Sequence, residues 1–164
     1  MIARRDRLSI IFATLAVALV LTLIPLPPTL DMLRPYWVAL VLIYWCLETR
    51  GLISLGLAFG LGLVLDLVTG SLLGLHALSL VIIVYLVTRF RARLRFFPPW
   101  QQALSVAALL IHARILLLWI ISLRGEPMPA LTFWLPAIVG TLLWPWLVLL
   151  LDRYRGTMRR RRHT

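Results

Sequence analysis

Six apolar runs, separated by short polar segments, occupy almost the whole of this 164-residue chain. Hydrophobic residues make up 62% of the chain and charged residues 14%, whereas soluble domains average about 45–50% and about 25%. A helix needs about 20 apolar residues to cross a bilayer, so this length accommodates about six crossings and no separate soluble domain. The sequence therefore predicts an all-α, polytopic integral membrane bundle.

The predicted transmembrane domain covers residues 1–152. Its expected spans are residues 8–24, 36–47, 51–68, 72–88, 102–123 and 131–151. Pro25 ends the first span, because proline cannot continue the hydrogen-bond ladder of a helix. The second run has only twelve residues, whereas a span needs about 17–25, so a re-entrant segment is the alternative there.

The distribution of arginine decides between these alternatives. If the second run spans the membrane, fourteen of the seventeen arginines lie on one side, in residues 4–7, 50, 89–95 and 153–162. If it does not, both large arginine clusters are translocated while the N-terminal cluster stays inside. Basic residues concentrate in cytoplasmic segments of membrane proteins. We therefore expect six spans, with both termini in the cytoplasm.

Two basic segments flank the predicted spans. The first holds Arg89, Arg91, Arg93 and Arg95 interleaved with aromatic residues, and the second is residues 153–164, with six arginines. Basic and aromatic residues together can bind nucleic acid. Because both segments adjoin apolar spans, the sequence favours contact with anionic phospholipid headgroups and no nucleic-acid partner. We expect the second segment to be a disordered cytoplasmic tail.

The stretch at residues 60–80 (GLGLVLDLVTGSLLGLHALSL) is typical of two membrane helices joined by a tight turn at residues 69–71. Asp66 and His76 are its ionisable side chains. A charged side chain near the centre of a bilayer costs at least about 2.5–3.5 kcal/mol and usually faces protein or a polar cavity. The position beside a turn favours a structural or partner-facing role over transport or proton relay, and hydration at the outer surface is a third interpretation. The candidate polar cluster comprises Asp66, Gly70, Gly74, His76 and Arg114.

Arg114 lies inside the fifth predicted span. It follows Trp100 by fourteen residues and Asp66 follows Gly51 by fifteen, so the helical rise places them about 21 and 22 Å from the inner edge. An ion pair between Asp66 and Arg114 would relieve two buried charges. Equal depth does not fix which faces of the two helices meet. The alternative is therefore that the Arg114 side chain extends outward without a partner.

The third predicted span contains the pair Gly56 and Gly60. Small residues four positions apart let helix backbones approach closely in lipid, so this pair is a candidate helix-packing seam. The alternative is that glycine is simply frequent in membrane helices.

The sequence carries no recognisable catalytic, phosphate-binding or metal-binding motif. It contains no phosphate-binding glycine loop, no metal-ligand spacing and no arrangement of nucleophile, base and orienting group. The carboxylates Glu48 and Asp66 lie toward opposite faces in the expected topology, too far apart for paired acid–base catalysis. We therefore expect a non-enzymatic protein with no metal and no cofactor.

Three segments together resemble the MreD family of bacterial rod shape-determining membrane proteins. Residues 66–78 (DLVTGSLLGLHAL) resemble the centre of the family, residues 34–45 (RPYWVALVLIYW) the start of its second span, and residues 95–103 (RFFPPWQQA) the loop before its fifth span. The length, the six-span layout and the basic ends are also similar.

The resemblance implies a scaffold of the cell-elongation machinery in the bacterial inner membrane. MreD proteins associate with MreC, and the assembly links MreB filaments to lateral peptidoglycan synthesis by RodA and its partner transpeptidase. The family's layout is also similar to that of the six-helix substrate-binding subunits of vitamin transporters. A small-solute-binding subunit of a membrane transporter is therefore the alternative function, with a pocket that would use Asp66, His76 and Arg114.

Overall fold

A computed structural model describes residues 2–49 and 51–160, and every regular element in this part of the chain is helical. The elements are α1 (Ile2–Leu23), α2 (Pro28–Asp31), α3 (Trp37–Glu48), α4 (Leu55–Thr69), α5 (Leu75–Leu94), α6 (Pro99–Leu123), the 3₁₀ turn η1 (Leu131–Trp134) and α7 (Leu135–Arg160). The all-α prediction is confirmed. Apart from the single turn α2 and η1, one helix corresponds to each predicted span.

Three helical segments are long and apolar enough to cross a membrane, at Leu75–Leu94, Pro99–Leu123 and Leu131–Tyr154. Three further apolar helices, Leu8–Leu23, Trp37–Glu48 and Leu55–Thr69, are shorter. Large apolar side chains are exposed on the outer faces, for example Trp119 on α6 and Leu142 on α7. Soluble proteins rarely expose many such side chains together, so this surface fits a protein that lies in lipid.

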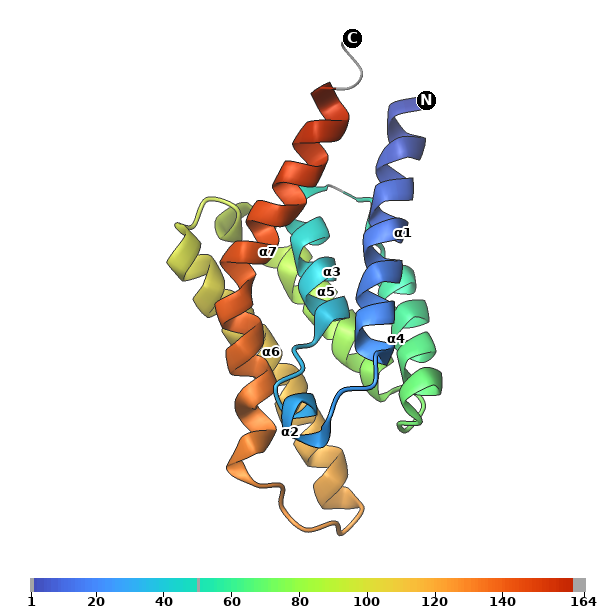
Figure 1. Ribbon diagram of the computed structural model, residues 1–164, viewed down its shortest axis with the longest axis vertical. Coiled ribbons are helices and arrows are strands. Elements are labelled where there is room, and N and C mark those ends of the chain that lie inside the picture. The colour runs from blue at the N-terminus through green and yellow to red at the C-terminus, as the bar shows by residue number, and fades with distance from the viewer. Residues whose placement is uncertain (1, 50, 161–164) are drawn as a thin grey trace.

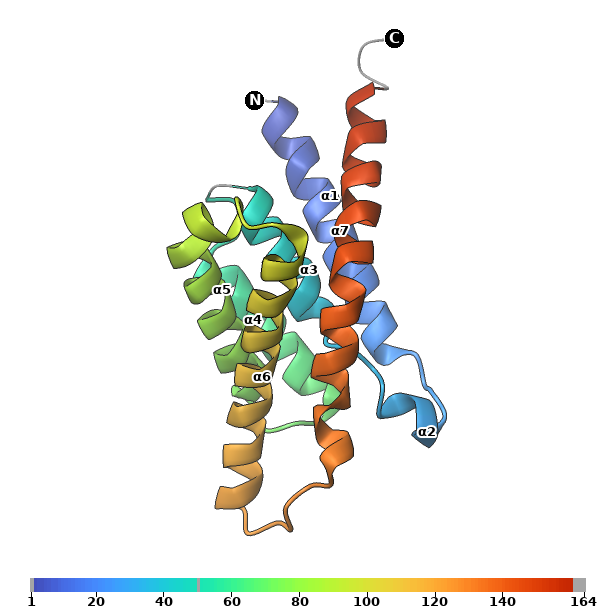
Figure 2. The same cartoon turned by 90° about the vertical axis from the view of Figure 1, so that its left-hand side faces the viewer.

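Successive long helices run in alternating directions, and the start of α1 and the end of α7 lie at the same end of the molecule (Figures 1 and 2). The ends of α3 and α5 also meet there, because Arg91 Nε donates a hydrogen bond to the Leu47 carbonyl at 2.9 Å. Three basic segments, residues 4–7, 89–95 and 153–160, therefore lie at one end of the bundle.

The short helix α3 lies at the centre of the bundle. Residues 38–47 are each at most 6% exposed, and α3 packs against α1, α5, α6 and α7. A helix that is apolar on every side is stable only when it is covered on every side. Its two polar aromatic groups find partners on neighbouring helices: Trp45 Nε1 donates to Thr14 Oγ1 at 2.9 Å and Tyr44 donates to Asp152 at 2.6 Å.

The closest helix pair is α4 and α5. A Cβ atom at Gly62 would overlap the backbone of Ala77, so the two helices approach to a distance that only glycine permits. Helix α4 begins at Leu55, four residues later than predicted, because Gly51 has a positive φ of 68° and Ser54 caps the helix by accepting from the Leu57 amide at 3.1 Å.

The last helix extends beyond the predicted span. α7 continues through Pro145 and on to Arg160, whereas the sequence predicted a disordered tail from residue 153. Arginine and methionine are good helix formers, so a helix started in the apolar span continues into the basic segment. Residues 161–164 of the predicted tail lie outside the described residues.

Candidate functional site: the turn between α4 and α5

Two glycines shape the connection between α4 and α5. Gly70 follows the last residue of α4 with φ +64°, and Gly74 precedes the first residue of α5 with φ +98°. Both conformations are left-handed and favour glycine. The connection is therefore longer than the predicted turn at residues 69–71, and α5 begins at Leu75 and not at residue 72, because the conformation of Gly74 is not helical.

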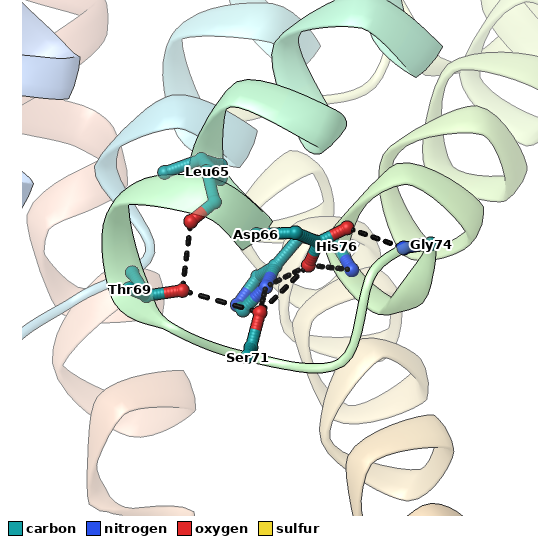
Figure 3. A network of polar contacts seen from close by, with 6 residues as sticks. All are labelled: Leu65, Asp66, Thr69, Ser71, Gly74 and His76. Atoms are coloured by element: carbon teal, nitrogen blue, oxygen red, sulfur yellow. Dashed lines mark hydrogen bonds and ion pairs between the residues drawn. The ribbon is translucent and has the colours of Figure 1, made fainter.

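The Asp66 carboxylate is the centre of this connection (Figure 3). Asp66 is 1% exposed, and its two oxygens accept four hydrogen bonds. Two come from backbone amides, from Gly74 at 2.7 Å and from His76 at 2.9 Å. The other two come from side chains, from the Ser71 hydroxyl at 2.8 Å and from His76 Nδ1 at 2.8 Å.

This carboxylate acts as the N-terminal cap of α5. Amides in the first turn of a helix have no partner within the helix, and the positive end of the helix dipole attracts an anion. Asp66 satisfies two of these amides from the last turn of the preceding helix. It thereby ties the end of α4 to the start of α5 across the two glycine conformations.

His76 completes the polar cluster. Its Nδ1 atom lies 2.8 Å from Asp66 and 3.1 Å from the Ser71 oxygen, and its ring meets the Tyr36 ring edge to face, with centroids 5.7 Å apart. Two acceptors would repel at 2.8 Å, so a proton lies between Nδ1 and the carboxylate. Thr69 joins the edge of the cluster, with its hydroxyl 3.2 Å from that of Ser71.

The geometry of this cluster is that of a joint between helices. Internal donors use both oxygens of the Asp66 carboxylate, and two of those donors are backbone amides that cannot move without unwinding α5. No group of three or more His, Cys, Asp or Glu side chains placed to hold a metal ion occurs in the described residues.

Of the two interpretations of Arg114, the hypothesis of an ion pair with Asp66 is wrong. Asp66 pairs with His76 instead, and the Arg114 guanidinium lies over the Phe133 ring at 5.0 Å from its centroid. Depth along the helix is similar for the two charges, but Asp66 is already fully engaged by residues close to it in sequence. Arg114 therefore forms no hydrogen bond or ion pair with the cluster of Asp66, Gly70, Gly74 and His76.

The two glycines predicted as a packing seam face outward. A Cβ at Gly60 would meet nothing within 4 Å, and one at Gly56 would meet only the Ser54 hydroxyl of its own helix cap. The close packing within the chain is instead at Gly62 and at Gly140, where a Cβ would lie 2.7 Å from a Leu110 methyl carbon. Spacing alone could not distinguish these positions, because every helix in this chain is apolar over most of its surface.

The predicted lipid-headgroup arginines lie around the end of α5. Arg89, Arg93 and Arg95 are exposed, while Arg91 is half-buried and bonded to α3. Three of the four, Arg89, Arg91 and Arg95, line a cavity of about 360 Å³.

Comparison with known proteins assigns the family. Residues 4–154 match the family model described as rod shape-determining protein MreD. The rod shape-determining protein MreD of Haemophilus influenzae is 38% identical over 149 residues, which cover 88% of this chain and 90% of the relative. No solved structure gives a significant match. Neither match supports the alternative of a transporter subunit, and the chain belongs to the MreD family of rod shape-determining proteins.

Proposed function

We propose that this protein is a non-enzymatic scaffold of the cell-elongation machinery in the bacterial inner membrane. In this role it binds MreC and helps couple MreB filaments to lateral peptidoglycan synthesis by RodA and its partner transpeptidase. Membership of the MreD family is the observation that carries the proposal. The structure is compatible with it, because the buried Asp66 carboxylate joins two helices and both of its oxygens already accept hydrogen bonds.

The proposed topology has six spans with both termini in the cytoplasm. Its supports are the alternating helix directions and the common end of α1 and α7 (Figure 1). The arginines of α5 and α7 then lie on the cytoplasmic side, as the positive-inside tendency requires. Helix α3, which is shorter than a full span, is covered by neighbours and need not match the bilayer thickness.

Cysteine labelling in intact cells tests this topology. We expect a membrane-impermeant maleimide to label Glu126→Cys, in the loop between α6 and α7, but to label Arg93→Cys only after the inner membrane is permeabilised. The native Cys46 is buried and gives a low background. Labelling of Arg93→Cys in intact cells would contradict the proposed orientation.

The outer face of α4 is the proposed contact for the single membrane helix of MreC. Gly56 and Gly60 lie one turn apart on this face without any neighbour from another helix, and the exposed Val64 and Leu67 continue it. Helix pairs in lipid associate where small residues let the backbones approach, since apolar burial gives little drive there.

We expect Gly60→Leu to reduce the amount of MreC that co-purifies in mild detergent, and to give rounded cells. The added side chain extends outward and would hold the MreC helix away from α4, because no atom of this chain lies near the position. Ala108→Leu, at an exposed small residue of α6, is the matched control and should retain MreC. Undiminished MreC recovery and normal rods in Gly60→Leu would remove this face from the interface.

The end of α5 is the proposed contact with anionic phospholipid. Arg89, Arg91 and Arg95 surround one cavity there, next to the exposed Phe96. Basic side chains beside aromatic anchors are typical of the headgroup layer on the cytoplasmic side.

A further inference from the structure

A second cavity, of about 150 Å³, lies between the start of α3 and the helices α6 and α7. Its lining includes the polar residues Thr22, Arg34, Tyr36, His76 and Arg114. It shares Arg34 and Arg114 with a hollow of about 400 Å³ that is bordered by residues 129–133 of the α6–α7 connection. The cavity therefore lies toward the end of the bundle away from the arginines of α5 and α7.

Hydrogen-bond donors without partners face this region. Arg114 has no hydrogen bond or ion pair within the described residues, and its guanidinium lies over the face of the Phe133 ring. Arg34 donates to the carbonyls of Thr22 and Ile24, yet its Nε is buried without a partner. The Tyr36 hydroxyl, at the start of α3, is also buried beside the cavity, with the Ser79 hydroxyl as its polar neighbour.

Arg114 lacks an ion-pair partner in the described part of the chain. Arg34 is neutralised by Asp31 at 2.8 Å, and the Asp66 carboxylate is engaged by His76. The charge of Arg114 remains without an anion, although the residue is half-buried and sits about nine residues from the end of α6. An unpaired charge in such surroundings is costly, and charged residues inside membrane bundles usually have a partner.

We propose that this cavity binds a phosphate group, with Arg114 as its charged donor and the Nε of Arg34 as a second donor. The guanidinium group carries five donors and no acceptor, so donors left over at a cavity call for a ligand that only accepts. Phosphate offers acceptor oxygens in several directions, which suits donors that come from the start of α3, the α2–α3 connection and α6. One ordered water needs about 10–15 Å³ of such a cavity, so its volume admits a group of this size.

The phosphate could belong to a lipid headgroup or be free in solution, and the test separates these sources. The measurement is the midpoint of thermal unfolding of the purified protein in neutral detergent. It is made with added phosphatidylglycerol and with added phosphatidylcholine. It is also made in inorganic phosphate and in chloride at equal ionic strength. We expect phosphatidylglycerol to raise the midpoint by roughly 5–10 °C at about 100 times its dissociation constant. Arg114→Gln should lose most of this rise.

Arg124→Gln is the matched control. It removes the same charge from the same end of the bundle, at an exposed arginine that pairs with Glu126 outside the cavity. This variant should keep the full rise of the unfolding midpoint. Any part of that rise that comes from lipid bound at the basic end of α5 is the same in all variants. A rise with inorganic phosphate alone that Arg114→Gln abolishes supports the site with a soluble ligand. Equal rises in the wild type and Arg114→Gln overturn the proposal.

Arg114→Lys keeps the test decisive if Arg114→Gln does not fold. Lysine retains the charge but lacks the planar fork that binds two phosphate oxygens at once. We expect a several-fold weaker apparent affinity for phosphatidylglycerol in this variant. An unchanged affinity would overturn the proposal.

Discussion

Gly62→Ala is expected to destabilise the protein by about 3 kcal/mol or more, the upper end of the range for an overpacked core. The added methyl group would overlap the backbone of Ala77 and the His76 carbonyl carbon of α5. A side chain could rotate away from such a clash, but backbone cannot, so α4 and α5 would have to separate. The separation would also stretch the hydrogen bonds between Asp66 and His76, which lie one turn away. Thermal unfolding in detergent measures the loss.

Gly60→Ala is the matched control for this prediction. It makes the same change two residues earlier on the same helix, where a Cβ would meet nothing within 4 Å. Alanine favours a helix interior over glycine by roughly 0.5–1 kcal/mol, so we expect this variant to be as stable as the wild type or slightly more stable. If Gly62→Ala and Gly60→Ala unfold at the same temperature, the close approach of α4 and α5 is not as described.

Asp66→Ala is expected to cost about 3 kcal/mol, because it removes one charged acceptor that serves two backbone amides and two side-chain donors. The carboxylate is 1% exposed, and its removal leaves the amides of Gly74 and His76 without their acceptor. The start of α5 should then unwind. Thermal unfolding and hydrogen exchange at the first turn of α5 measure the two effects.

Two milder variants establish the cause of that loss. Asp66→Asn keeps one carbonyl acceptor but presents an NH₂ group to the remaining donors, and His76→Ala removes the side-chain bond while keeping the backbone amide. Each should cost about 1.5–3 kcal/mol, the range for a hydrogen bond to a charged group. A stable Asp66→Ala protein that nevertheless fails to maintain cell shape would contradict the structural role and point to a partner-facing one.

The sequence by itself determined the all-helical class, the six apolar helices and the polar turn. Each follows from local chemistry: the backbone of an apolar run is satisfied in lipid only as a helix, and Pro25 and Gly70 mark where helices cannot continue. Asp66 and His76 could be singled out because ionisable groups are rare in such surroundings. Their mutual bond could not be predicted, since the course of the chain through Ser71 depends on two left-handed glycines.

The tertiary structure alone decided which faces meet. Asp66 and Arg114 have similar depth, yet they do not pair, and Gly56 and Gly60 have the expected spacing, yet Gly62 makes the close contact. In a soluble helix the boundary between apolar and polar residues shows which side is buried. Here both protein and lipid are apolar, so the sequence of a helix carries little information about its rotation, and that rotation is fixed by packing against neighbours.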